Sequence, residues 1–237
     1  IIYLVIDKQP ENIIDLSDND TKEQRGEKLI LNGMARDYFQ RECLMKGISE
    51  AKDDDLILIS DLDELPNLNE LDFKNIKNNI IIFEQKMFYY KFNLLHKDFL
   101  WYGSKITKKK NLISPQWLRN VKSKKYPLWR FDILFSKTKY NKINFIRDGG
   151  WHFTNVKSPE KIDYKMKNFL HHLEYEESGL GVEDVRKIIL EKKVFYNHQA
   201  DKKEKKWGAE INLVKENDQN LPKYIVQNKE KFNSWLD

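Results

Sequence analysis

The chain has 237 residues, of which 40% are hydrophobic and 13% aromatic, enough for one sizeable core or two small ones. Its 42 basic and 37 acidic residues leave a net charge of +5, a mildly basic balance that suits anionic ligands such as nucleotide diphosphates and leaves nucleic acid possible. The single cysteine, Cys43, excludes an intrachain disulfide, and no apolar stretch approaches the length of a membrane span.

The chain begins with an apolar run. Residues 1–6, IIYLVI, predict a buried strand, and because the first residue is Ile we expect a fragment or a processed chain whose natural start lies upstream. No signal peptide is visible, so we expect a cytoplasmic protein, with an upstream membrane anchor left open. Residues 7–21 are polar and turn-rich, and residues 22–51 predict a helix with a break near Gly33.

Three carboxylates follow the next predicted strand. Residues 56–60 are mostly apolar, and Asp61, Asp63 and Glu64 come directly after them. Open α/β sheets bind ligands at the carboxyl ends of their strands, and crowded carboxylates repel one another unless a cation joins them. A divalent metal, held by one or two carboxylates and by substrate phosphates, would satisfy this arrangement. The alternative is an acidic turn, since Asp favours turns and a bare Asp-x-Asp is a weak motif.

The remaining predicted elements differ between the two halves of the chain. Residues 67–78 predict a short helix, and residues 80–83 and 86–92 predict buried strands. The alternation of strands and helices in this half predicts an α/β fold with a mostly parallel sheet. The second half predicts strand-like segments around Ile106, at 131–135 and at 143–146, and helices at 158–177 (Ser158 as N-cap, Pro159 in first position), 182–193 and 222–235.

A second candidate site is Asp148-Gly149-Gly150-Trp151-His152-Phe153. The glycines allow close backbone approach, Trp151 offers a flat apolar face for a sugar ring, and Asp148 and His152 offer a base and a metal ligand. The alternative is a glycine turn before a strand, with Trp151 in the core and His152 hydrogen-bonded to a neighbour.

A third candidate lies late in the predicted helix 158–177. His171 and Glu174 are three residues apart and share a helix face, so they could ligate a metal, or the glutamate could orient the histidine. The alternative is an exposed polar face or a histidine packed against an aromatic ring, and this alternative suits His172 best.

Arg41 lies on the helix that precedes the acidic segment. Its guanidinium group could grip a phosphate or carboxylate with two hydrogen bonds. The alternative is a salt bridge to Glu42 or to the acidic loop. The lysine clusters at 108–110 and 122–125 fit a solvated surface, because no nucleic-acid-binding signature accompanies them.

In combination, these segments resemble glycosyltransferase family 17, whose best-known member adds the bisecting N-acetylglucosamine to N-glycans. The similar segments occur in the family's order and span nearly the whole chain. They are RDYFQRECLMKG (36–47), ILISDLDELP (57–66), Trp101-x-Gly103, SPQWLR (114–119), GGWHFTN (149–155), 161–174, and Leu221-Pro222-Lys223-Tyr224. The family's upstream segment, which carries its first strand and a Phe-Asn-Glu-Leu-Asp run, has no counterpart here.

The resemblance implies a GT-A-like fold and an inverting transfer of a sugar, N-acetylglucosamine by family, from a uridine diphosphate donor to a glycan or glycoconjugate acceptor. Because the sequence shows no repeats and no clear interdomain linker, we expect one domain over 1–237, with a nucleotide-sugar and metal half (1–100) and an acceptor half (101–237). The resemblance also implies a divalent metal, Mn²⁺ or Mg²⁺. The implied residues are Asp61, Asp63, His152 and His171 for the metal, Asp148 or Glu174 as base, and Arg41, Asp61, Glu64 and Trp151 for donor and acceptor.

Two other functions remain open at this stage. A metal-dependent phosphohydrolase could use the same carboxylates, although it would need a second metal and more His or Asp ligands than five histidines readily supply. A non-catalytic module that binds glycans or polyanions could use the basic, aromatic second half. Our expectation for partners is a nucleotide sugar and a glycan, with no nucleic acid and no membrane segment in this chain.

Overall fold

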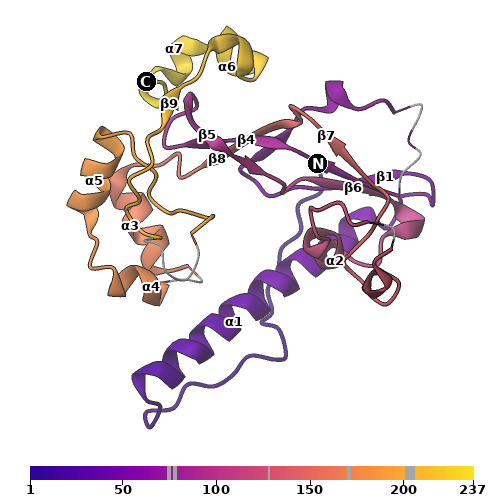
Figure 1. Ribbon diagram of the computed structural model, residues 1–237. Coiled ribbons are helices and arrows are strands. Elements are labelled where there is room, and N and C mark those ends of the chain that lie inside the picture. Colours follow the sequence, from indigo (N-terminus) through magenta and orange to yellow (C-terminus); the bar gives the residue numbers. More distant parts are fainter. Residues whose placement is uncertain (74–75, 77–78, 128, 170–171, 201–205) are drawn as a thin grey trace. The chain divides into compact units, whose positions relative to one another are not determined.

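The computed structural model describes residues 1–73, 76, 79–127, 129–169, 172–200 and 206–237 (Figure 1). The chain forms two compact units that interleave along the sequence. Unit 1 comprises residues 1–61, 69–83 and 102–147, and unit 2 comprises residues 62–68, 84–101 and 148–237. The boundary falls inside the acidic segment, between Asp61 and Leu62. The division into a donor half at 1–100 and an acceptor half at 101–237 stays a prediction.

Unit 1 is built on a four-stranded sheet in the order β1 (Leu56–Ile59), β6 (Lys105–Lys108), β3 (Ile80–Phe83) and β7 (Ile143–Ile146). The pair β3–β7 is parallel, whereas β1–β6 and β3–β6 are antiparallel. All four residues of β3 are buried, because alternate side chains enter cores on opposite faces. Ile80 and Ile82 join one cluster with Ile57 and Ile59, and Ile81 and Phe83 join another with Ile106.

The helices of unit 1 begin at clear capping residues. Thr21 caps α1 (Lys22–Cys43), and its capping box with Gln24 satisfies backbone groups at both residues. The helix runs through Gly33 without the predicted break and continues into a 3₁₀ turn, η1 (Leu44–Ile48). Ser114 caps α2 (Pro115–Asn120), which packs against α1. Three further 3₁₀ turns are η2 (Leu68–Glu70), η3 (Lys109–Asn111) and η4 (Phe131–Ile133).

Unit 2 is built on a five-stranded sheet in the order β2 (Glu64–Pro66), β8 (Gly150–Thr154), β4 (Gln85–Tyr89), β5 (Leu94–Trp101) and β9 (Val214–Lys215). The pair β4–β8 is parallel and the others are antiparallel. The side chains of β4 alternate between two cores. Met87 and Tyr89 enter the larger one, and Phe88 enters a smaller one with Leu95 and Leu221.

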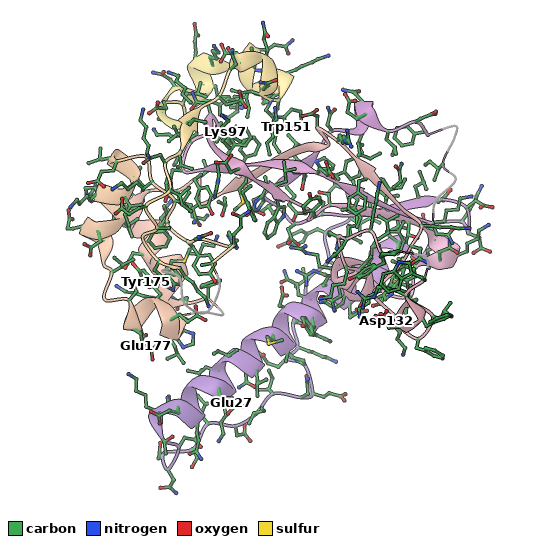
Figure 2. The ribbon with its side chains drawn as sticks, viewed as in Figure 1. Glu27, Lys97, Asp132, Trp151, Tyr175 and Glu177 are labelled. Atoms are coloured by element: carbon green, nitrogen blue, oxygen red, sulfur yellow. The ribbon has the colours of Figure 1, made fainter. Side chains whose placement is uncertain are left out.

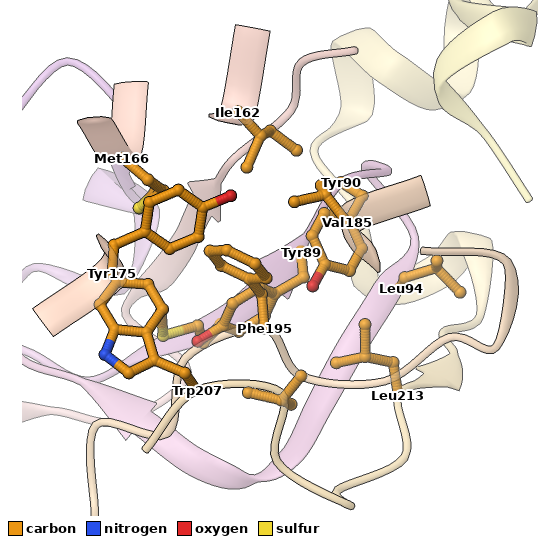
Figure 3. Close-up of a cluster of buried hydrophobic side chains, with 12 residues drawn as sticks. Tyr89, Tyr90, Leu94, Ile162, Met166, Tyr175, Val185, Phe195, Trp207 and Leu213 are labelled. Atoms are coloured by element: carbon orange, nitrogen blue, oxygen red, sulfur yellow. The ribbon is translucent and has the colours of Figure 1, made fainter. Parts of the chain in front are cut away.

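The larger core of unit 2 is shown in Figure 3, where Tyr89, Tyr175, Phe195 and Trp207 pack together. It is covered by α3 (Pro159–Lys167), α4 (His172–Glu177) and α5 (Val182–Leu190). Ser158 caps α3 with Pro159 in the first position, as predicted. The C-terminal segment contains η5 (Asp218–Asn220), α6 (Lys223–Gln227), α7 (Lys229–Phe232) and η6 (Asn233–Trp235) in place of one predicted helix.

The prediction of a mixed α/β chain is confirmed, but the prediction of a mostly parallel sheet is wrong. Both sheets are mixed, and β3–β7 and β4–β8 are their parallel pairs. Parallel neighbours require that a helix return the chain between successive strands. Instead, β4 and β5 are joined through a short turn at residues 90–93, and such a connection can only produce antiparallel neighbours.

Other local predictions also fail. Residues 1–6 form no strand within the described residues, and Ile1, Ile2 and Val5 are exposed. The following segment binds α1 instead, since Asn32 forms two hydrogen bonds with the backbone of Ile14. Residues 131–135 form no strand: Phe131–Ile133 is a 3₁₀ turn, Phe131, Leu134 and Phe135 are exposed, and Asp132 forms ion pairs with Arg130 and Lys139. No helix within the described residues is long and apolar enough to cross a membrane.

Candidate functional site

Segments distant in sequence meet in unit 2 around His152, and we call these residues the Asp63 cluster: Asp63, Glu64, Trp101 and His152. His152 Nε2 lies 3.4 Å from an Asp63 carboxylate oxygen. The indole of Trp101 stacks on the imidazole, with ring centroids 4.6 Å apart and planes 11° from parallel. The same indole donates its Nε1–H to Glu64 Oε1 at 2.6 Å. One tryptophan therefore contacts both the imidazole and a carboxylate.

The strand pairing explains why these residues meet. Residue 64 on β2 lies directly opposite residue 152 on β8, and the backbone N–H of Phe153 donates to the carbonyl of Asp63 at 2.8 Å. Gly150 makes this pairing possible. Its φ is +129°, and a Cβ there would lie 2.2 Å from the carbonyl oxygen of Leu65. The glycine thus lets β2 approach β8 closely enough to bring Asp63 to His152.

The charges around Asp63 favour its ionised form. Burial alone raises the pKa of Asp63, but the hydrogen bond and charge of His152 and the charge of Lys165 outweigh it and lower the pKa below its ordinary value of 3.8. Lys165 shows the reverse balance. Burial lowers its pKa, and the charge of Asp63 partly offsets that change. Asp63 therefore carries a negative charge throughout the physiological pH range.

The residues fit a divalent metal only in part. Among the described residues, no group of three or more His, Cys, Asp or Glu side chains could hold a metal ion, and His171 lies outside the described residues. Asp63, with 41% of its side chain exposed, suits a Mg²⁺ or Mn²⁺ ion whose shell is completed by phosphates and water. A ligating histidine usually donates its second ring nitrogen to an acceptor, whereas the buried Nδ1 of His152 has no partner in the described part of the chain. His152 is thus better suited to orient Asp63.

A separate cluster in unit 1 contains Asp61. Its Oδ2 accepts a hydrogen bond from Arg119 at 3.0 Å, and its Oδ1 one from Arg41 at 3.5 Å. Arg41 also donates to Asp37 at 2.9 Å and to Gln116 at 2.5 Å. The alternative for Arg41, a salt bridge to the acidic loop, is therefore observed. A metal at Asp61 would compete with two guanidinium groups, and this cluster is better suited to hold two arginines side by side for an anion.

Trp151 and His152 do not share a site. Neighbouring residues of a strand point to opposite faces of the sheet, and Trp151 packs on the smaller core with Phe153 while His152 stacks on Trp101. The indole N–H of Trp151 (labelled in Figure 2) donates to the carbonyl of Asn220 at 2.6 Å. The alternative in which Trp151 packs in a core is therefore observed in part. A pocket of about 140 Å³ beside it is lined by Asn67, Lys86, Asp148, Gly150, Trp151, Gln219 and Asn220.

The two predicted bases lie in different surroundings. Asp148 has a positive φ of 47° and an 81% exposed side chain that lies 3.9 Å from Lys86 Nζ. Glu174, on α4, lies 3.8 Å from Lys206 Nζ. Burial raises the pKa of Tyr196, and the charge of Glu174 raises it further. Either carboxylate is accessible enough to take a proton.

Sequence reasoning did not place three residues that contribute to these clusters. Trp101 belonged to the family-like segments, but its contact with His152 could not be read from a Trp-x-Gly motif. Arg119 stood in the Ser-Pro-Gln-Trp-Leu-Arg segment without an assigned role. Lys165 carried no sequence signal, since lysines are frequent throughout the chain. Comparison of the chain with models of protein families, with curated proteins and with solved structures finds no match.

Proposed function

We propose that this chain is an inverting glycosyltransferase of the family 17 type, with a GT-A-like fold. It would move a sugar, N-acetylglucosamine by that resemblance, from a uridine diphosphate donor to a hydroxyl of a glycan or glycoconjugate. One observation supports this above all. Three family-like segments that are distant in sequence, at Asp63-Glu64, Trp101 and His152, contact one another in unit 2.

The residues of the Asp63 cluster suit the departure of a nucleoside diphosphate. Trp101 holds the imidazole of His152 by stacking, and His152 faces the ionised Asp63. A divalent metal, when bound at Asp63 with the donor phosphates, would neutralise the charge that develops on the leaving group. In unit 1, Asp61 orients Arg41 and Arg119, whose guanidinium groups match phosphate oxygens in geometry and charge.

The transfer also needs a base for the acceptor hydroxyl on the face opposite the leaving group. Asp148 and Glu174 both remain candidates in this proposal. Glu174 lies 3.8 Å from Lys206, next to Trp207 in the aromatic part of unit 2, whereas Asp148 lies on the side of Trp151 and Lys86. We place the reaction in the cytoplasm, where the single buried Cys43 would stay reduced.

Donor binding tests the proposal directly. Melting temperature and donor hydrolysis would be measured across nucleotide sugars, with and without Mn²⁺, for the unmodified protein, for Asp63→Asn and for the exposed control Asp18→Asn. We expect uridine diphosphate N-acetylglucosamine and Mn²⁺ together to raise the melting temperature of the unmodified protein and the control, but not of Asp63→Asn. A shift that needs no metal and survives in Asp63→Asn would contradict the proposal. Full-rate donor cleavage without any acceptor would instead indicate a phosphohydrolase.

A further inference from the structure

Unit 2 contains a cavity of about 220 Å³ whose described lining includes none of the predicted site residues that the structure describes. We call it the aromatic cavity. Its lining combines ring faces with a few polar groups, and the residues that matter here are Asn155, Lys165, Phe169, Tyr196, His198 and Trp207. Its volume is below the usual range of drug-sized pockets, which begins at roughly 300 Å³. The cavity therefore suits one small ring.

The walls of the aromatic cavity are continuous with the Asp63 cluster. His198 makes an edge-on contact with Trp101 at 5.6 Å between ring centroids, and Trp101 is the residue that stacks on His152. Tyr196 contacts His198 at 4.9 Å and Trp207 at 4.8 Å. Lys165 lines the cavity and also acts electrostatically on Asp63. His198, by its ring contact with Trp101, and Lys165, by its charge, thus connect the cavity to the cluster that contains the carboxylate we assign to the donor.

The lining of the cavity carries polar groups that can form hydrogen bonds with a ligand. Lys165 Nζ donates to Asn155 Oδ1 at 3.0 Å. Asn155 is buried and has a φ of +53°, a left-handed conformation that asparagine adopts more readily than most other residues. Trp207 is 6% exposed, and its Nε1 has no hydrogen-bond partner among the described residues. A buried donor without an acceptor is unfavourable, and a ligand oxygen would relieve it. Figure 3 shows this nitrogen at the margin of the core, on the side away from Leu213.

We propose that the aromatic cavity binds one neutral pyranose ring of the acceptor glycan, an inference that rests on the proposed transferase function. Aromatic faces pack against the C–H surface of a sugar ring, and hydroxyl groups accept from Trp207 and Lys165 and donate to Asn155. An anionic ring is less suitable, because the negative charge of Asp63 already acts on the positive charge of Lys165. The cavity would set the acceptor hydroxyl beside the donor, and Glu174 is the candidate base connected to its lining, since it lies 3.8 Å from Lys206, the residue before Trp207.

The test observes Trp207 directly. Methyl N-acetylglucosaminide, methyl mannoside and uridine would each be titrated into the isotope-labelled full chain, without donor or metal, while the indole N–H resonances are recorded. Trp207→Phe assigns the Trp207 resonance, and the exposed Trp129 of unit 1 serves as internal control. We expect at least one methyl glycoside to shift the Trp207 resonance with a dissociation constant in the millimolar range, roughly 1 mM, and to leave Trp129 unchanged.

Variants decide whether the shift comes from the aromatic cavity. Lys165→Met should weaken binding about tenfold, the equivalent of one lost hydrogen bond to a charged donor, whereas Lys187→Met on the surface of α5 should not change it. A Trp207 resonance that no glycoside shifts would overturn the inference, and so would a shift caused by uridine alone. Because donor and metal are absent, a failure here is distinct from a failure of donor binding in the transferase test.

Discussion

The imidazole of His152 lies flat on the indole of Trp101, 4.6 Å between ring centroids and 11° from parallel. The stack directs Nε2 of His152 toward Asp63, while the indole N–H holds Glu64 at 2.6 Å. Trp101 therefore positions two of the three acidic side chains that follow β1. This relationship links the acidic segment to β5 and β8, and the predictions below begin from it.

Trp101→Phe should lower the free energy of unfolding by about 1.5–3 kcal/mol, since it keeps a ring on His152 but removes a hydrogen bond to a buried carboxylate. Urea unfolding would measure the change. A double-mutant cycle with Glu64→Leu, which removes the acceptor, isolates the pair. Additive effects of the two substitutions would show that the hydrogen bond contributes nothing.

Stability should depend on pH through Asp63. Folding lowers the pKa of Asp63 below 3.8, so its ionised form stabilises the fold above pH 3.8, and this contribution is lost as the pH falls through the lower folded-state pKa. The difference in unfolding free energy between the unmodified protein and Asp63→Asn should therefore shrink as the pH falls below 3.8. Unfolding curves at a series of pH values would measure it. A difference that grows toward acid would contradict the assignment.

Gly150→Ala should be severely destabilising, by roughly 3 kcal/mol or more, because its Cβ would lie 2.2 Å from a carbonyl oxygen of β2 in a conformation unfavourable to alanine. Gly179 provides a matched control. It also has a positive φ, +70°, but nothing lies within 4 Å of its added Cβ, so Gly179→Ala should cost only about 1 kcal/mol. Equal melting temperatures for the two variants would show that the close approach of β2 and β8 is absent.

Arg41→Lys should weaken uridine diphosphate binding about tenfold, the equivalent of one charge-assisted hydrogen bond of roughly 1.5 kcal/mol. A lysine keeps the charge but cannot reproduce the planar fork that contacts Asp37, Gln116 and Asp61. Arg36→Lys, on the same helix, is the control, since Arg36 bonds only to Gln9 among the contacts found in the described residues. Calorimetry would measure both. Equal affinities for these two variants would exclude Arg41 from the donor site.

The base can be identified by comparing Asp148→Asn with Glu174→Gln. Loss of a general base typically reduces turnover by about 10²–10⁴-fold with little effect on donor affinity. The aromatic cavity favours Glu174, so Glu174→Gln should show the large loss in kcat and Asp148→Asn a small one. Initial rates at saturating donor would separate them. The reverse order would assign the role to Asp148.

The sequence by itself determined the elements whose signal is local. The run Ile80–Phe83 is a strand buried on both faces, because a continuous apolar segment can only be satisfied by two cores. Ser158 and Pro159 begin a helix, because a side-chain cap and a fixed φ act within one turn. The sequence also predicted that Arg41 lies on a helix before the acidic segment, because helical spacing is a local signal too.

The tertiary structure decided in which direction each strand runs, which of its side chains face a core and which strand it pairs with. These features are set by contacts with backbone segments that are distant in sequence. The short turn after β4 made its neighbour antiparallel, and Ile1–Ile6 stayed out of the sheets although their composition favours a strand. Trp151 and His152 are adjacent in sequence but face different cores, while Trp101 and His152 are far apart and stack. A motif shows which chemistry a chain carries; only the pairing of β2 with β8, permitted by Gly150, decided which of those groups could act together.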